Sequence, residues 1–402
     1  MKRVFVTGMG AISAIGIGIE ANTTSLREGK SGIKAIKNLD TIYRGKYSAA
    51  EIDLSNDELA DLIPHFDKNK LHTRGQLLSL IAVNEALDDA KLNREETEDL
   101  TIITANTIAG MDITEKYYRD SKAELQYYFN RAHSSGETSR KIADYIKSNG
   151  LITTITTACS SSANAIILGS RLIRSGRAKR VLVGGSDPIT KFSLNGFASL
   201  LIYDEHACKP FDKNRNGLNL GEAGAFLVLE SEDVVGSKQS YGEVLGFSNR
   251  NEAYHATASS PEGKGARLCI QEALKNANLT PSQIDFVHAH GTATPNNDES
   301  ELNALKHVFG NNIPPFCSTK SYIGHTLGAA GALNAIYTLL AMKQRFLFKN
   351  LNFNTPIEKD YIPIIQTKEN VDINYALSNA FGFGGNNSSI IFSNSPKGGN
   401  NA

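Results

Sequence analysis

Short apolar runs alternate along the chain with longer segments that carry apolar residues at helical spacing. Runs rich in β-branched residues predict strands at Arg3–Thr7, Thr101–Ala105, Arg180–Gly184, Ala225–Leu229, Gly242–Gly246, Phe286–Ala289 and Ser389–Phe392. Amphipathic segments predict helices at Gly75–Ala90, Ser161–Arg174, Gly265–Asn276, Glu299–Val308 and Ala329–Gln344. Because strands and helices alternate, we expect an α/β protein in which helices cover mixed sheets.

Two parts of the chain follow the same plan. A strand, small residues and a helix occur in this order at Thr154–Ile167 and again at Phe316–Ile336, and both copies contain Asn-Ala-Ile. At 402 residues the chain exceeds one ordinary hydrophobic core, so two related halves are expected. Duplication would bring Cys159 towards the region of His325. Chance similarity between two α/β units is the alternative.

Composition and charge narrow the class of protein. Lys plus Arg and Asp plus Glu both number 42, so no overall field would attract nucleic acid or an anionic membrane surface. No apolar run approaches the ~20 residues that a membrane-spanning helix needs. Four cysteines without a C-x-x-C pair argue against structural zinc or disulfides and indicate a reducing, cytoplasmic location. The polar tail Asn394–Ala402 predicts disorder.

One cysteine occupies a position suited to nucleophilic chemistry. Cys159 stands where β-branched residues give way to serines and a predicted helix. Unpaired N–H groups and the helix macrodipole favour a thiolate at such a position, which predicts a lowered pKa for Cys159. A small core cysteine would suit the apolar surroundings equally well.

Two histidines lie at the ends of predicted elements. His290 follows a strand and precedes a Gly-Thr turn, and period-two alternation places His288 on the same face. His325 lies at the second strand-to-helix junction. With Cys159 they form a candidate site for nucleophilic and acid–base catalysis. The alternative is a metal-dependent hydrolase built on His288, His290, Asp298 and Glu301.

Two glycine-rich stretches resemble nucleotide-binding motifs only in part. Gly8 and Gly10 follow a strand, but the next glycine, Gly16, comes too late for the pattern G-x-G-x-x-G. The stretch Phe381–Asn387 lacks the Lys-Ser or Lys-Thr pair of a P-loop. Glycines also permit tight turns that direct backbone N–H groups at an oxyanion, which suits the second stretch equally well.

In combination these residues resemble the β-ketoacyl-[acyl carrier protein] synthases of the thiolase superfamily, specifically the group that uses Cys-His-His. The resemblance spans nearly the whole chain and is carried in order by Val6–Gly10, Thr157–Ser161, Lys209–Asp212, Gly221–Gly224, His290–Thr294, Ser318–Lys320, Gly324–Gly331 and Asn379–Asn387. It implies a thiolase-like five-layer α/β/α/β/α sandwich of two related halves. Residues 1–240 would carry the nucleophile and residues 241–402 the two histidines.

The resemblance also implies roles for the site residues. Cys159 would accept an acyl group from the phosphopantetheine arm of acyl carrier protein, and His290 and His325 would assist decarboxylation of a malonyl thioester. Backbone N–H groups of Cys159 and Phe383 would form an oxyanion hole, Phe383 would also gate acyl access, and Lys320 would hold the electrostatics of the site. No metal and no cofactor is implied. Acyl carrier protein and a second subunit, either identical or a paralogue, are the implied partners.

Further residues match the family in position. The resemblance implies that Asp298 and Glu301 support the loop of His290. It also implies a positive rim for docking an acidic carrier protein, formed by Lys68, Lys70, Arg74, Lys209, Lys213 and Arg215.

The chain departs from the family at Ala14, Ala223 and Asn386 and most strongly in residues 111–146. That segment contains Tyr117, Tyr118, Tyr127, Tyr128 and Phe129. The sequence therefore leaves open which acyl group is used and whether the pathway is fatty-acid or polyketide synthesis.

Three other classes of protein remain as alternatives to a condensing synthase of the Cys-His-His type. A degradative thiolase would need a second cysteine in a C-terminal Cys-x-Gly motif, which is absent. An initiating synthase of the Cys-His-Asn type would lack the histidine found at His325. A non-catalytic partner subunit would typically lose the cysteine found at Cys159.

Overall fold

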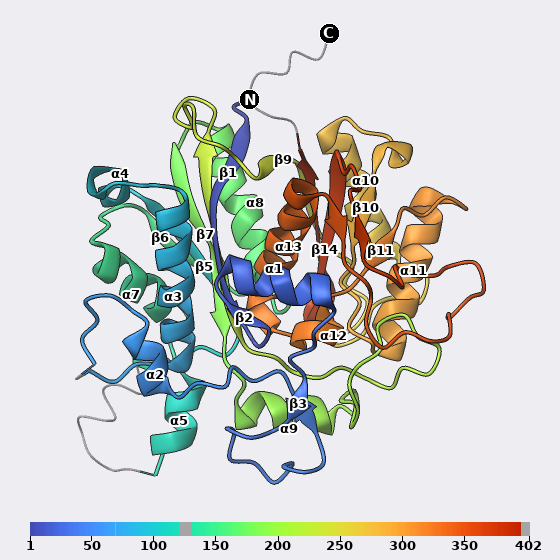
Figure 1. Cartoon of the computed structure of the whole chain (residues 1–402), viewed down its shortest axis with the longest axis horizontal. Coiled ribbons are helices and arrows are strands. Elements are labelled where there is room, and N and C mark those ends of the chain that lie inside the picture. The colour runs from blue at the N-terminus through green and yellow to red at the C-terminus, as the bar shows by residue number, and fades with distance from the viewer. Residues whose placement is uncertain (69, 120–130, 395–402) are drawn as a thin grey trace.

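The computed structural model describes residues 1–68, 70–119 and 131–394 (Figure 1). Its centre is an 11-stranded mixed sheet in the order β11-β10-β14-β15-β9-β1-β8-β7-β5-β6, with β2 paired to β1. The strands of this sheet are β1 (Val4–Ser13), β2 (Gly16–Ile17), β5 (Thr101–Ala105), β6 (Ile152–Ile155), β7 (Arg180–Asp187), β8 (Ala223–Ser231), β9 (Gly242–Asn251), β10 (Phe286–His288), β11 (Phe316–Cys317), β14 (Tyr375–Gly382) and β15 (Asn386–Ser393).

The remaining elements connect these strands and cover them. Two short pairs stand apart from the main sheet, β3 (Lys34–Ala35) with β4 (Ser48–Ala49) and β12 (Phe346–Leu347) with β13 (Lys368–Glu369). The helices are α1 (Ile19–Glu28), α2 (Asn56–Asp61), α3 (Arg74–Asp89), α4 (Arg94–Glu98), α5 (Met111–Tyr117), α7 (Glu137–Ile146), α8 (Ser161–Arg174), α9 (Lys191–Ser199), α10 (Lys264–Ala277), α11 (Pro295–Phe309), α12 (Lys320–Ile323) and α13 (Ala330–Gln344). Single 3-10 turns are η1 (Pro281–Gln283), η2 (Leu327–Ala329) and η3 (Phe383–Gly385).

The elements stack in five layers. Helix α3 covers the outer face of β1, β8 and β7, whereas α10 covers β9 and β15 and packs against α11. Helices α8 and α13 lie between the two parts of the sheet, where α8 contacts β7 and α13 contacts β14 (Figure 1). This arrangement confirms the α/β class and the α/β/α/β/α order that the resemblance implies.

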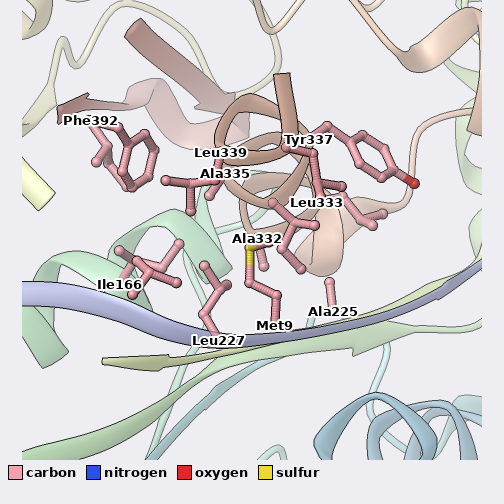
Figure 2. Packing of buried hydrophobic residues seen from close by; sticks show 14 of the residues in the cluster. Met9, Ile166, Ala225, Leu227, Ala332, Leu333, Ala335, Tyr337, Leu339 and Phe392 are labelled. Carbon is pink, nitrogen blue, oxygen red and sulfur yellow. The ribbon is translucent and has the colours of Figure 1, made fainter. Parts of the chain in front are cut away.

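The central layer contains the largest buried core. Figure 2 shows Met9 and Leu227 from the sheet facing Ile166 of α8 and Leu333 of α13, with Phe392 of β15 at the far side. These five residues are all 0% exposed. Full burial of such a side chain stabilises the fold by about 1.5–3 kcal/mol. The two predicted strand-to-helix junctions therefore lead into one shared core.

Glycines set how closely the layers approach. A Cβ at Gly10 would lie 2.0 Å from the carbonyl oxygen of Ala82, so α3 packs directly on the backbone of β1. A Cβ at Gly331 would lie 2.5 Å from the backbone nitrogen of Ala163, where α13 crosses α8. The early glycine run thus serves helix-on-sheet packing, and α3 covers the backbone that a dinucleotide would need.

The structure differs from the expected pattern mainly in two strands. β1 continues past Thr7 to Ser13, because its glycines lie under α3 instead of ending the strand. The pattern gave no sign of β14, a central strand, since polar side chains interrupt it. One of these, Asn379, is fully buried and hydrogen-bonds Glu301 and Ser389.

Two further expectations concern membrane-spanning helices and residues outside the described ranges. None of the helices in residues 1–68, 70–119 and 131–394 is long and apolar enough to cross a bilayer. The aromatic residues Tyr127, Tyr128 and Phe129, and the tail beyond Asn394, lie outside the described residues.

Candidate active site

Cys159 lies in the tight connection between β6 and α8. The preceding residue, Ala158, has left-handed backbone (φ 52°), a conformation that costs free energy in a residue with a side chain. Ser161 holds this turn, because its hydroxyl donates to the carbonyl of Ala158 (2.6 Å) and accepts from the N–H of Thr157 (2.8 Å). The sulfur is thereby held at the start of α8, and Cys159 as a residue is 6% exposed.

The acidity of the thiol differs from the prediction. Burial raises the pKa of Cys159 to about 11, whereas the sequence position predicted a lowered pKa. The Lys320 ammonium and the backbone N–H groups of Phe383 and Cys159 act in the opposite direction. Loss of hydration therefore outweighs the favourable helix start, and the resting sulfur is a neutral thiol.

His325 is held through its backbone and through one nitrogen of its ring. Its backbone pairs with the strand-like segment 219–221, through His325 N–H to Asn219 (2.7 Å) and Gly221 N–H to His325 (3.0 Å). The N–H of Leu327 donates to Nδ1 of His325 at 3.3 Å. Burial, followed by the Lys320 charge, lowers the pKa of His325 well below its ordinary value. A neutral ring that accepts at Nδ1 carries its proton on Nε2.

His290 faces His325 across the site. The two ring centroids are 5.4 Å apart at an interplanar angle of 82°. Burial lowers the pKa of His290 well below its ordinary value, and the Lys320 charge acts in the same direction, as a proton on His325 would. Lys320 donates to the carbonyl oxygen of His290 at 2.5 Å. Both imidazoles are therefore neutral at physiological pH.

Two buried carboxylates fix the loop of His290. Glu301 accepts the N–H groups of His290 (2.9 Å) and Gly291 (2.8 Å), and burial raises the pKa of Glu301 to about 7. Asp298 accepts the N–H groups of Ala293 (3.0 Å) and Phe211 (2.7 Å). These contacts are those expected of residues that support a loop.

Cys159, His290, His325 and Phe383 line one cavity of about 370 Å³, whereas Lys320, Asp298 and Glu301 are not among its lining residues. Phe383 lies at this cavity with its ring 5.8 Å from that of Phe197, and a Cβ at Gly382 would lie 3.0 Å from the backbone nitrogen of Cys159. The lining consists of Cys159, Phe197, Leu201, Ile202, Asn216, Leu218, Thr257, Ala258, Ser259, His290, Thr292, Thr294, Pro295, Asn296, Asn297, His325, Phe381, Gly382 and Phe383. The sulfur and both imidazoles thus converge, although they are distant in the chain.

The structure gives no support to the metal-hydrolase alternative. β10 ends at His288, and the ring nitrogens of His288 lie 3.1 Å from the hydroxyls of Thr319 and Thr338 in the core. His290 instead reaches the cavity. Within the described part of the chain, no group of three or more His, Cys, Asp or Glu side chains is arranged to hold a metal ion.

Two residues of the predicted docking rim are not on a rim. Arg74 is only partly exposed and is paired with Glu222, with its Nη2 2.7 Å from a carboxylate oxygen. Arg215 is 8% exposed, donates to the carbonyls of Asp212 and Pro295, and lies 3.7 Å from Asp298. Neither guanidinium is free to meet a partner, so this part of the prediction is wrong.

The other predicted docking residues are accessible. Lys68 pairs with Asp61 and Lys70 with Asp67, and both lysines stay exposed. Lys213 is exposed and Lys209 is half-buried.

Sequence reasoning missed some residues of the site. Phe381 packs beside His290 with ring centroids 5.8 Å apart, and Asn379 donates to Glu301 at 3.1 Å. Both lie in the motif Asn379–Asn387, and membership of that motif is the sequence feature that could have identified them. Asp187 lies outside every motif on which the family resemblance depends.

The layered fold and the Cys-His-His cavity define a thiolase-like protein. Residues 1–234 match the family model "Beta-ketoacyl synthase, N-terminal domain" and residues 241–354 match "Beta-ketoacyl synthase, C-terminal domain". The chain belongs to the β-ketoacyl synthase family.

Relatives agree with this family over nearly the full length. A 3-oxoacyl-[acyl-carrier-protein] synthase 2 of Staphylococcus aureus (strain COL) is 31% identical, over 97% of this chain and 98% of the relative. Among solved structures, the ishigamide ketosynthase/chain length factor is similar with a TM-score of 0.89 at 30% identity, covering 98% of this chain and 99% of that chain. A type II PKS acyl-carrier protein in complex with its ketosynthase gives a TM-score of 0.86 at 26% identity, covering 98% and 99%.

Proposed function

We propose that this protein is a β-ketoacyl-[acyl carrier protein] synthase. It joins an acyl thioester on Cys159 to malonyl-carrier protein by decarboxylative Claisen condensation, in fatty-acid or polyketide synthesis. The observation that carries this proposal is the convergence of one thiol and two neutral imidazoles on one cavity. Family membership and the names of the relatives support it.

The first step is acyl transfer to the sulfur. Cys159 attacks the thioester carbonyl of acyl-carrier protein, an acyl–Cys159 thioester forms, and the carrier leaves as a free thiol with the proton of Cys159. Because the pKa of this thiol is raised to about 11, the thiolate has to form as the substrate binds. The Lys320 charge and the N–H of Phe383 favour that thiolate.

The second step is decarboxylation of the malonyl thioester. The carboxylate leaves as carbon dioxide and its electron pair becomes an enolate, whose oxygen gains negative charge. His325 carries a proton on Nε2, so it can donate to this oxygen, and His290 lies beside it. Carbon dioxide loss supplies the carbanion, so the reaction needs neither a metal nor a redox cofactor.

The third step forms the carbon–carbon bond. The carbanion attacks the acyl carbonyl on Cys159, and the tetrahedral oxyanion is held by the backbone N–H groups of Cys159 and Phe383. Collapse expels the sulfur as a thiolate, which takes a proton from water, and β-ketoacyl-carrier protein leaves. Phe383 follows Gly382 and precedes Gly384 (φ 79°), so its loop can swing and gate acyl access.

Supporting residues complete the assignment. Lys320 holds the carbonyl of His290 and sets the charge of the site, while Asp298 and Glu301 serve structure. We assign carrier-protein docking to Lys68, Lys70, Lys209 and Lys213. We also place a boundary near residue 240, with the nucleophile before it and both histidines after it.

Partner and location belong to the same proposal. The partner is an acyl carrier protein, whose phosphopantetheine arm enters the cavity, and the second subunit is an identical chain or a paralogue. A cytoplasmic location is supported by Cys159, Cys208, Cys269 and Cys317, which are all free thiols.

A product assay tests the proposal. Purified protein is incubated with malonyl-carrier protein and a panel of acyl-carrier proteins of different chain length, and the carrier products are weighed by mass spectrometry. We expect β-ketoacyl-carrier protein from at least one acyl donor, and none with Cys159→Ala. Product formation that survives Cys159→Ala would contradict the assignment.

A further inference from the structure

Asp187 is a buried acid that none of the proposed steps uses. It ends β7 and is 0% exposed. In the part of the chain that the structure describes, no cation forms an ion pair with it at 4.0 Å or less. A buried carboxylate without a counter-ion is costly to keep, so its contacts should explain its presence.

Both oxygens of Asp187 accept hydrogen bonds from two separate loops. After β5, the N–H of Thr107 donates to both oxygens (3.0 Å each), the hydroxyl of Thr107 to Oδ2 (2.7 Å) and the N–H of Ile108 to Oδ1 (2.9 Å). From η2, the N–H of Gly328 donates to Oδ2 (2.7 Å). The carboxylate therefore ties the end of β5 to the turn that follows His325.

That turn determines which nitrogen of His325 is protonated. Leu327 stands between His325 and Gly328 in the turn, has left-handed backbone (φ 50°), and donates its N–H to Nδ1 of His325 at 3.3 Å. Left-handed backbone is unfavourable for leucine, so contacts around the turn must hold it. The hydrogen bond from the N–H of Gly328 to Asp187 is such a contact, and it lies directly next to Leu327 in the chain.

We infer that Asp187 is a positioning residue for His325. By holding Gly328, it keeps the N–H of Leu327 on Nδ1 and so keeps the proton of His325 on Nε2, facing the malonyl thioester. This inference rests on the proposed function, in which His325 donates to the enolate oxygen. Asp187 itself touches no substrate.

Only a carboxylate can make this set of contacts. Asparagine offers one carbonyl oxygen, and its NH₂ group would then face either the N–H of Ile108 or the donors at Gly328 and Thr107. The space is also limited, because a Cβ at Gly328 would lie 2.6 Å from Oδ2 of Asp187. Burial raises the pKa of Asp187 to about 6, and its hydrogen bonds oppose that rise, so the group is mainly ionised at neutral pH.

The test separates the two partial reactions in Asp187→Asn. Acyl transfer is followed as the mass of acyl-Cys159, and decarboxylation as carbon dioxide released from malonyl-carrier protein by the acylated enzyme. We expect decarboxylation to fall about 10- to 100-fold, since a misplaced group near the reacting atoms can cost that much. Acyl transfer should stay at or above about a third of the wild-type rate. The variant keeps Cys159 and its turn, and it removes the Asp187 charge that contributes to the raised pKa of Cys159.

Asp285→Asn is the matched control. Asp285 also accepts two backbone N–H groups, from Asn374 (2.7 Å) and Tyr375 (3.0 Å), but it precedes β10 and so lies at the end of this strand away from the site. This control should lower the melting temperature without changing either partial reaction. If Asp187→Asn does not fold, Thr107→Val removes only the hydroxyl bond to Asp187, and decarboxylation should fall with acyl transfer retained.

The outcomes distinguish this inference from the proposed function. Decarboxylation at the wild-type rate in folded Asp187→Asn, or a parallel loss of both partial reactions, would overturn the positioning role. A wild-type protein that forms no acyl-Cys159 would instead overturn the proposed function. A spectroscopic readout adds to this: the ¹⁵N signals of His325 should show Nε2 protonated in wild type and a mixture of tautomers in Asp187→Asn.

Discussion

Burial acts in opposite senses on the reacting groups of this cavity. It raises the pKa of the Cys159 thiol to about 11 and lowers the pKa of His290 and His325 well below their ordinary values. All three groups are therefore neutral at rest. Neutral imidazoles suit hydrogen-bond donation to an enolate, whereas the neutral thiol has to lose its proton during acyl transfer.

The raised pKa of Cys159 predicts how the free enzyme reacts with iodoacetamide. Only the thiolate reacts, so alkylation of Cys159 should accelerate about tenfold per pH unit between pH 7 and pH 9, without a plateau. The measurement is the mass of the peptide that contains Cys159 at timed intervals. A plateau near pH 7 would show instead that the helix start and Lys320 outweigh burial.

Substitutions of Arg215 and Lys213 should affect the free energy of unfolding differently, although the two residues are close in the chain. Arg215→Ala leaves Asp298 without its cation and several carbonyls without a donor, which should cost about 3 kcal/mol in the free energy of unfolding. Lys213→Ala is the control, because Lys213 is exposed and its loss should not change stability measurably. Denaturant titration of both variants measures the difference, and equal stabilities would contradict the structural role of Arg215.

The sequence predicted site residues better than it predicted their surroundings. Cys159, His290 and His325 could be found because each lies at the end of an element within a recognisable motif. Their pKa values, the ion pair of Arg74 and the burial of Arg215 depend on which segments fold over them. Asp187 was missed for the same reason, since its partners Thr107 and Gly328 are remote in the chain.

At the scale of elements, the crossing of α8 and α13 determines where the junction residues lie. α8 begins just after Cys159 and α13 begins just after the turn of His325, so their contact sets the separation of sulfur and imidazole. Gly331 permits this contact, because a Cβ there would lie 2.5 Å from the backbone nitrogen of Ala163.

Gly331→Ala should therefore separate the two central helices. We expect the free energy of unfolding to fall by about 1–3 kcal/mol, with a larger relative loss in condensation rate than in acyl transfer. Gly196→Ala in α9 is the control, since nothing lies within 4 Å of a Cβ there and alanine favours a helix. Unfolding curves and both partial reactions are measured, and identical behaviour of the two variants would contradict this account.

Elements with a clear period could be predicted, and those without one could not. Helix α8 and strand β5 lie where the pattern placed them, because apolar periodicity decides both. Strand β14 was missed because its buried side chains include Asn379, whose side chain hydrogen-bonds Glu301 of α11 and Ser389 of β15.

At the scale of the whole molecule, the two halves form one body. β9 pairs with β15 on one side and with β1 on the other, through Phe5 with Glu243 and Val6 with Gly242. The central core takes side chains from both halves (Figure 2). The cavity takes Cys159 from the part that matches the N-terminal family model and the two histidines from the part that matches the C-terminal model. The sequence echo predicted such a meeting, and the resemblance supplied its order of layers.

In the proposed reaction, an acyl group bound to Cys159 is consumed by a malonyl-derived carbanion that forms beside His290 and His325. A pulse–chase experiment tests it directly: the enzyme is loaded with an acyl-carrier protein, freed of carrier, and then given malonyl-carrier protein while peptide masses are followed. We predict an acyl adduct on Cys159 that disappears during the chase as β-ketoacyl-carrier protein and carbon dioxide appear. An adduct on another residue, or an adduct on Cys159 that persists through the chase, would contradict the account.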